Sequence, residues 1–238
     1  MRVALIAGIA LAGAAPASAT VVVTTFTGIV GDAQGNVGAS SPFGAIAAGT
    51  QTYSLVYTID DGVGGASVAT GTYGKSVSGT GSVTAALTIN GITRTIGGQT
   101  VSSAEHKNAE PDSGRLFDRV LRMSQDFSNV GGLYSDAYAQ TSVGSYLSDY
   151  LANGDYATPF TYTPVGTDSY LSTVHFNIFD FNTNTQIVNV YLNLGVGSIT
   201  SMVVGEVPEP ASWALMLGGF GMVGGAMRRR AGLRPRLA

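Results

Sequence analysis

Residues 82–96 have the sequence SVTAALTI-NG-ITRTI, in which two β-branched runs flank Asn90-Gly91. Asn and Gly tolerate the positive φ angles of a tight type I′ turn, so this stretch predicts a β-hairpin. Residues 51–59 alternate between apolar and polar side chains, which is typical of a half-buried strand. Its apolar face consists of Tyr53, Leu55, Tyr57 and Ile59. The two stretches together favour an all-β protein.

Further strands are predicted at both ends of the body of the chain. The first covers Thr20–Val30, and a second hairpin joins Leu171–Phe181 to Gln186–Leu194. Charged residues make up 11% of the chain, against about 25% in ordinary soluble domains, and strong helix formers are few. We therefore predict a single all-β domain with a β-sandwich or jelly-roll-like architecture. The apolar anchors predicted for its first strand are Val21, Val23 and Phe26.

Three segments of the body are predicted to lie outside regular strands. Residues 62–81 are rich in Gly, Ser and Thr and are predicted to form a surface excursion. Ser102–Ser113 carries the densest charge and is predicted to be a solvated loop, while residues 143–153 favour a helical turn. The segment 114–127 fits either a strand or a short helix.

The N-terminus has the pattern of a secretory signal peptide. Arg2 precedes an uncharged run from Val3 to Ala15, which ends in Pro16-Ala17-Ser18-Ala19. The small residues Ala17 and Ala19 predict cleavage after Ala19, with Thr20 as the mature N-terminus. We therefore expect export through the general secretion translocon; an uncleaved membrane anchor is the alternative.

The C-terminus has the pattern of a short membrane span. No residue from Ala211 to Met227 is charged, and these positions span about 25 Å as a helix, against a bilayer core of about 30 Å. Trp213 suits the headgroup level at one end, and Arg228–Arg230 favour the cytoplasmic side at the other. A plain C-terminal tail anchor and a buried apolar helix are the alternatives.

One ordered set of residues in this tail resembles a known signal. Pro208-Glu209-Pro210, Trp213-Ala214, the short glycine-rich span and Arg228–Arg230 follow one another as in the PEP-CTERM sorting signal, in its PEPxxWA variant. The resemblance covers the tail alone, and the extra residues Ala231–Ala238 depart from the usual pattern.

This resemblance implies a processing pathway. An exosortase, a membrane-embedded cysteine-type transpeptidase or protease, would process the chain near Pro208-Glu209-Pro210. The arginines would retain the precursor transiently in the inner membrane of a Gram-negative bacterium. The ectodomain would then reach the cell surface or the exopolysaccharide matrix. The implied division of the chain is a signal peptide at residues 1–19, an ectodomain at 20–205 and a sorting tail at 206–238.

Charge and cysteine content exclude several classes of function. Residues 20–205 contain 6 Lys and Arg but 13 Asp and Glu, a net charge of −7. Nucleic-acid binding needs a basic face, so we expect no nucleic-acid partner. The chain contains no cysteine, which excludes thiolate chemistry and disulfides.

Candidate catalytic motifs are weak. Ala69–Ser76 fits a loosened phosphate-binding loop, but the residues after it do not predict the helix that such a loop opens. The two histidines, His106 and His175, show no arrangement with a nucleophile and an orienting carboxylate. We therefore expect no enzymatic activity and no cofactor. A surface hydrolase, with two carboxylates converging in a cleft, is an alternative that no spacing favours.

Calcium is the only ion that the turns suggest. Asp180-Phe181-Asn182-Thr183-Asn184 resembles the start of a calcium loop, but Thr185 replaces the usual Gly and no acidic residue closes the loop. We predict no metal ligands, with a structural calcium ion as the alternative.

Glycan binding is the alternative function of the ectodomain, beside a structural or adhesive role. Tyrosines concentrate between Gly131 and Thr163, where exposed rings could stack on sugars, although they could equally fill the core. The candidate contacts of this carbohydrate-binding module are Tyr134, Tyr138, Tyr146 and Tyr150.

Overall fold

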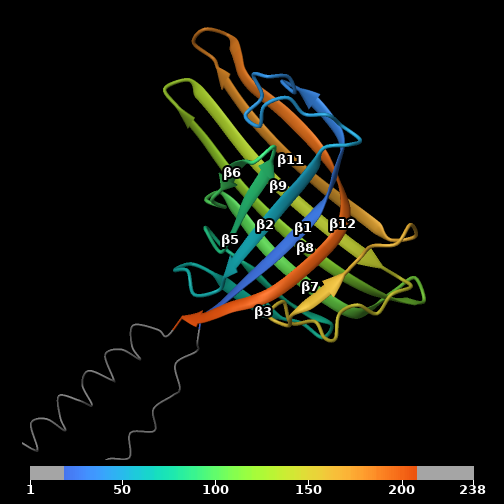
Figure 1. The fold of residues 1–238 in the computed structure, drawn as a ribbon. Helices are drawn as coiled ribbons and strands as arrows, with labels where there is room; N and C mark the ends of the chain where they lie inside the picture. Colours follow the sequence, from blue (N-terminus) through green and yellow to red (C-terminus); the bar gives the residue numbers. More distant parts are fainter. Residues whose placement is uncertain (1–18, 208–238) are drawn as a thin grey trace, which may run out of the picture. The chain divides into compact units, whose positions relative to one another are not determined.

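The computed structural model describes residues 19–207, which consist of strands and connecting loops (Figure 1). Within this range no helix is present that could cross a membrane. Residues Thr20–Val207 form one compact unit. The strands are β1 (Ala19–Gly35), β2 (Thr52–Asp60), β3 (Ser67–Thr70), β4 (Gly74–Ser78), β5 (Val83–Ile89), β6 (Ile92–Ile96), β7 (Val101–Asp112), β8 (Arg115–Val130), β9 (Leu133–Ser145), β10 (Phe160–Tyr162), β11 (Ser169–Asp180) and β12 (Thr185–Val207).

The predicted hairpins are confirmed. β5 pairs with β6 in antiparallel register from Ile89–Ile92 to Ala85–Ile96, and Asn90 and Gly91 have φ angles of 54° and 74°. Both φ angles are positive, as the type I′ turn expected for Asn-Gly requires. The predicted apolar face of β2 is fully turned inward: Tyr53, Leu55, Tyr57 and Ile59 are all buried.

A single sheet contains all the strands, in the order β3-β4-β7-β8-β9-β11-β12-β1-β2-β5-β6, with β10 added beside β12. The all-β prediction is confirmed, but the architecture is one curled antiparallel sheet, a half-barrel, instead of two separate sheets. In Figure 1, β1, β2 and β5 cross in front of β7, β8 and β9, so one continuous sheet supplies both walls around the core.

The long strand β12 explains this curl. Its first part pairs with β11, up to Thr173–Asn193, whereas its later residues 199–201 pair with β10. Glycines lie where β12 turns against β1: a Cβ atom at Gly28 would lie 1.8 Å from the carbonyl oxygen of Gly195. Glycines in a strand permit such sharp coiling and close approach of backbones. One strand can therefore belong to both walls.

Side chains, not a ladder of backbone bonds, join the far end of the sheet to β8. The carboxylate of Asp126 accepts hydrogen bonds from the amides of Gly97 (2.6 Å) and Gln99 (2.8 Å), just beyond β6. The hydroxyl of Ser124 donates to the carbonyl of Ile96 at 3.2 Å. These contacts hold β6 against the opposite wall and cover that side of the core.

Four sequence predictions of local structure need correction. In β1, Val22, Thr24 and Phe26 face inward, whereas Val21 and Val23 are only half-buried. Residues 21 and 23 cannot share a face with residue 26, because side chains alternate along a strand. The predicted helical turn at residues 143–153 is absent, since β9 continues to Ser145 and irregular chain follows.

The charged segment Ser102–Ser113 is a strand of the sheet, β7, and not a solvated loop. Its small and neutral residues Ser102, Ala104 and His106 are buried on one face of the strand. Glu105 and Lys107, on the other face, are half-buried. The charge density concealed this alternation of period two. The predicted excursion at residues 62–81 likewise contains two short strands, β3 and β4.

Candidate functional site

The residues of the predicted sorting signal and one residue of the predicted signal-peptide cleavage site lie outside the described residues. This applies to Ala17, Pro208, Glu209, Pro210, Trp213, Ala214, Arg228, Arg229 and Arg230, and to the predicted membrane helix at residues 211–227. Ala19 and Thr20 are described, at the start of β1.

The start of β1 and the end of β12 lie side by side at one pole of the domain (Figure 1). Hydrogen bonds between hydroxyls join Thr24 to Ser201 (3.1 Å) and Thr27 to Ser198 (2.7 Å), so the strands run in opposite directions. Extending this register brings Thr20 level with Gly205. The N-terminal end of β1 and the C-terminal end of β12 therefore lie at the same pole.

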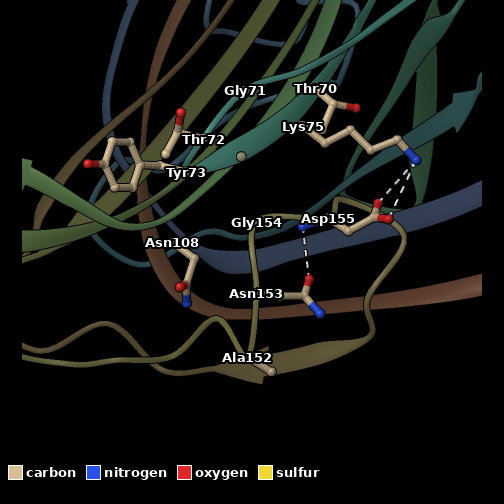
Figure 2. Close-up of a pocket in the computed structure, with 11 residues that line it drawn as sticks. Thr70, Gly71, Thr72, Tyr73, Lys75, Asn108, Ala152, Asn153, Gly154 and Asp155 are labelled. Carbon is tan, nitrogen blue, oxygen red and sulfur yellow. Dashed lines mark hydrogen bonds and ion pairs between the residues drawn. The ribbon is translucent and has the colours of Figure 1, made fainter.

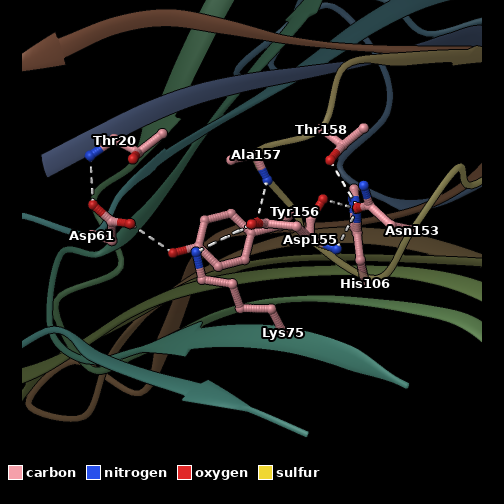
Figure 3. A network of polar contacts seen from close by, with 9 residues as sticks. All are labelled: Thr20, Asp61, Lys75, His106, Asn153, Asp155, Tyr156, Ala157 and Thr158. Atoms are coloured by element: carbon pink, nitrogen blue, oxygen red, sulfur yellow. Dashed lines mark hydrogen bonds and ion pairs between the residues drawn. The ribbon is translucent and has the colours of Figure 1, made fainter. Parts of the chain in front are cut away.

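A chain of polar contacts begins at Thr20 (Figure 3). The Thr20 amide donates a hydrogen bond of 2.6 Å to Oδ1 of Asp61, and the Tyr156 hydroxyl donates to Oδ2 of the same carboxylate at 2.8 Å. The ammonium of Lys75 lies 4.8 Å from the centre of the Tyr156 ring and 3.4 Å from the carboxylate of Asp155. The loop that carries residues 155 and 156 is thus tied to the N-terminal end of β1.

A cleft lies beside this chain of contacts, at the turn between β3 and β4 (Figure 2). It has a volume of about 480 Å³ and is lined by Thr70–Lys75, Asn108 and residues 152–155. The amide of Gly71 donates to the carbonyl of Gly74 and closes a hairpin, so the loosened phosphate-loop motif does not open a helix. The geometry that binds phosphate in such loops is missing here.

The most unusual group in the interior is Arg122 of β8, whose side chain is fully buried. Within residues 19–207 no carboxylate pairs with it. Its donors instead reach the Thr24 hydroxyl at 3.2 Å, the carbonyls of Glu105 (3.2 Å) and Leu121 (2.9 Å), and Nε2 of His106 at 2.6 Å. Burial lowers the pKa of Arg122 to about 9, so it remains a cation at neutral pH.

This contact assigns the tautomer of His106. A guanidinium can only donate, so Nε2 accepts and the proton lies on Nδ1, which is 3.2 Å from the carbonyl oxygen of Asp155. Burial first, and then the charge of Arg122, lower the pKa of His106 well below its ordinary value. Both ring nitrogens are engaged, so His106 cannot serve as a general base without breaking this network.

The four candidate tyrosines do not form one site. Tyr134 and Tyr138 lie on the outer face of β9, and Tyr138 is 6.1 Å from the His175 ring. Tyr146 packs on Phe117 beside a separate small cleft, at a ring distance of 4.5 Å. Tyr150 stacks on Tyr162 at 4.1 Å and donates to the carbonyl of Val143, as a packed residue would.

The suspected calcium turn is an ordinary hairpin turn between β11 and β12. Oδ1 of Asp180 accepts the amide of Asn182 at 2.9 Å, and Asn184 has a positive φ of 52°. In the part of the chain that the structure describes, no three His, Asp or Glu residues converge on a common point. Local hydrogen bonds therefore account for the Asp and Asn residues in this turn.

Sequence reasoning missed the Arg122–His106 contact because the two residues come from different strands. Residues 102, 104 and 106 and residues 120, 122 and 124 each share a strand face, and that period is visible in the sequence. The charge density of Ser102–Ser113, however, favours a solvated loop, and residues 114–127 fit either a strand or a short helix. The pairing of β7 with β8 brings them together, with Ala104 opposite Arg122.

Comparison with known proteins identifies one segment. Residues 206–230 match the family model of the PEP-CTERM protein-sorting motif, which confirms the resemblance seen in the tail. No characterised protein and no solved structure matches the chain significantly. The motif implies an exported protein that is anchored transiently at the membrane and processed there by an exosortase-type enzyme.

Proposed function

We propose that this exosortase substrate is a structural or adhesive protein of the cell surface or exopolysaccharide matrix of a Gram-negative bacterium. After export through the secretion translocon, the signal peptide is cleaved after Ala19. Residues 211–227 hold the precursor in the inner membrane, with Arg228–Arg230 on the cytoplasmic side. The observation that carries the proposal is the sorting motif at residues 206–230.

The ends of the described domain support this order of events. Thr20 and Val207 border the same pole, so both cleavages would leave the paired strands intact. Cleavage after Ala19 turns the Thr20 amide into an α-ammonium, directed at the Asp61 carboxylate that is 2.6 Å away. A charge-assisted contact of this kind is stronger than the neutral hydrogen bond it replaces. The mature N-terminus thus gains an ion pair that the precursor lacks.

The polar groups of the domain support a role without catalysis. His106 is enclosed by Arg122 and Asp155, while His175 lies on the outer face, 3.2 Å from the carboxylate of Asp136. Lys75 and Asp155, the charged residues of the cleft at the β3–β4 turn, pair with each other. These groups are engaged in contacts that hold the fold.

Replacing Pro208-Glu209-Pro210 with three alanines tests the sorting proposal. We expect export and signal-peptide removal to continue, because the N-terminus is unchanged, while a full-length form accumulates in the inner membrane. Immunoblots of fractionated native-host cells measure the ratio of precursor to mature protein.

A matched triple alanine variant at Gly232-Leu233-Arg234 changes the tail outside the matched motif and should be processed normally. Equal processing of the Pro208–Pro210 variant and the native chain would refute the role of the motif.

A further inference from the structure

An open groove lies on the outer face of the sheet, where the turns of the β8–β9 and β11–β12 hairpins meet. It has a volume of about 290 Å³ and is lined by Tyr134, Asn177, Phe179, Phe181 and Gln186. Tyr134 is the cross-strand partner of Phe179, which in turn is opposite Gln186. Three neighbouring strands therefore supply the lining, at positions that all project from the same face.

The aromatic residues of the groove are half-buried (Tyr134 and Phe179) or exposed (Phe181). Phe181 is 59% exposed and Phe127, at the margin, is 49% exposed. Phe181 contacts Phe179 and Tyr134 at ring distances of 4.9 and 6.3 Å, and Phe127 lies 5.5 Å from Tyr134. Large apolar side chains that gather at the surface mark a binding site more often than isolated ones do.

The two hairpin turns hold these rings in place. The Phe181 amide donates to the carbonyl of Gly132 at 2.9 Å, and Nδ2 of Asn182 donates to the carbonyl of Gly131 at 2.7 Å. Gln186 is fixed in the same way, because its Nε2 donates to Oδ1 of Asn177 at 2.7 Å and to the carbonyl of Ile178 at 2.9 Å. A ligand would meet a surface that is already ordered, which lowers the entropy lost on binding.

The chemistry of the groove favours one class of ligand. All five lining side chains are uncharged, and the strands that carry them add two carboxylates, at Asp136 opposite Asn177 and at Asp180 between Phe179 and Phe181. Phosphates and anionic polysaccharides would be repelled, whereas neutral sugars carry no charge. The C–H faces of a sugar ring can stack on Phe179 and Phe181, and its hydroxyls can exchange hydrogen bonds with amide and phenol groups.

We propose that this groove binds a neutral polysaccharide chain. Its partly exposed rings and open sides suit a polymer that passes across the surface, and the groove lies at the turn end of β12, whereas both domain ends leave from the opposite end of that strand. The chemical part of the proposal does not depend on sorting.

Isothermal titration calorimetry of the full chain in detergent micelles tests the groove directly. The probes are cellohexaose, laminarihexaose, maltohexaose and the neutral polysaccharide fraction of the host's own surface, with polygalacturonate as an anionic comparison. We expect saturable binding of a neutral probe and at least a tenfold loss of affinity in Phe181→Ala and Phe179→Ala. The matched control Tyr170→Ala removes a 51% exposed ring from the same strand outside the groove and should bind normally.

Several outcomes would overturn the proposal: binding of no neutral probe, binding of polygalacturonate alone, or equal affinities in the native chain and the groove variants. Concentration-dependent self-association that disappears in Phe181→Ala, without glycan binding, would instead assign the groove to a second copy of this chain. The binding experiment uses the purified full chain and needs no exosortase. Absence of glycan binding would therefore not affect the sorting proposal, and normal processing of the Pro208–Pro210 variant would not affect the glycan-binding result.

Discussion

Replacing Arg122 with alanine is expected to lower the free energy of unfolding of the chain Thr20–Val207 by about 3–5 kcal/mol. The substitution empties a fully buried site and leaves His106 Nε2, the Thr24 hydroxyl and the carbonyls of Glu105 and Leu121 without their donor. Urea unfolding at pH 7, followed by far-ultraviolet circular dichroism, measures the change at constant denaturant slope.

The variant Arg122→Met is the informative comparison. Methionine fills much of the same volume but carries no charge, so it avoids the desolvation of a guanidinium. We expect it to be less destabilised than the alanine variant. An alanine variant within about 1 kcal/mol of the native chain, less than the usual cost of a large-to-small core change, would show that Arg122 is not a structural centre of the interior.

Acidification from pH 7 to pH 5 is expected to lower the free energy of unfolding by up to about 2 kcal/mol through protonation of His106 in the unfolded chain. Its pKa is lowered in the folded state, so the unfolded chain binds the proton more tightly. The contribution of neutral His106 to the free energy of unfolding is therefore fully present above the unfolded-state pKa of about 6.5. It is lost as the pH falls below that value. The pKa values of Asp168 and Asp180 lie below their ordinary value of 3.8, so these carboxylates change the stability only at lower pH.

The two histidines of the chain permit a matched test. His106→Gln should remove most of the change in unfolding free energy between pH 7 and pH 5, whereas His175→Gln, a change on the outer face, should retain it. A pH profile that flattens in the His175 variant instead would assign the effect to the His175–Asp136 pair, which is 3.2 Å apart.

Local signals in the sequence predicted much of the fold. The Asn90-Gly91 turn and the alternation of Tyr53, Leu55, Tyr57 and Ile59 depend on backbone sterics and strand period, which act within a few residues. The curl depends on distant contacts instead. Gly28 and Gly195 are far apart in the sequence but lie against each other in the fold. No local pattern in the sequence shows which strands will be neighbours.

The candidate groove likewise depends in part on a residue visible in the sequence and in part on contacts between distant segments. Tyr134 is among the tyrosines predicted for glycan contact. The residues that complete the groove all come from the β11–β12 hairpin: Asn177, Phe179, Phe181 and Gln186. Only the pairing of β9 with β11 brings them together. Tyr150 has the same residue type and a similar neighbourhood in the sequence, yet it packs against Tyr162. Residue type alone could not separate these two environments.

The intact mass of the protein recovered from surface fractions of its native host tests the central claim most directly. The claim is that signal-peptide cleavage and tail processing together release the β-domain. The account predicts a mass that begins at Thr20 and ends between Glu206 and Ala211. A mass that runs to Ala238 would contradict it, because the tail would then be an ordinary membrane anchor.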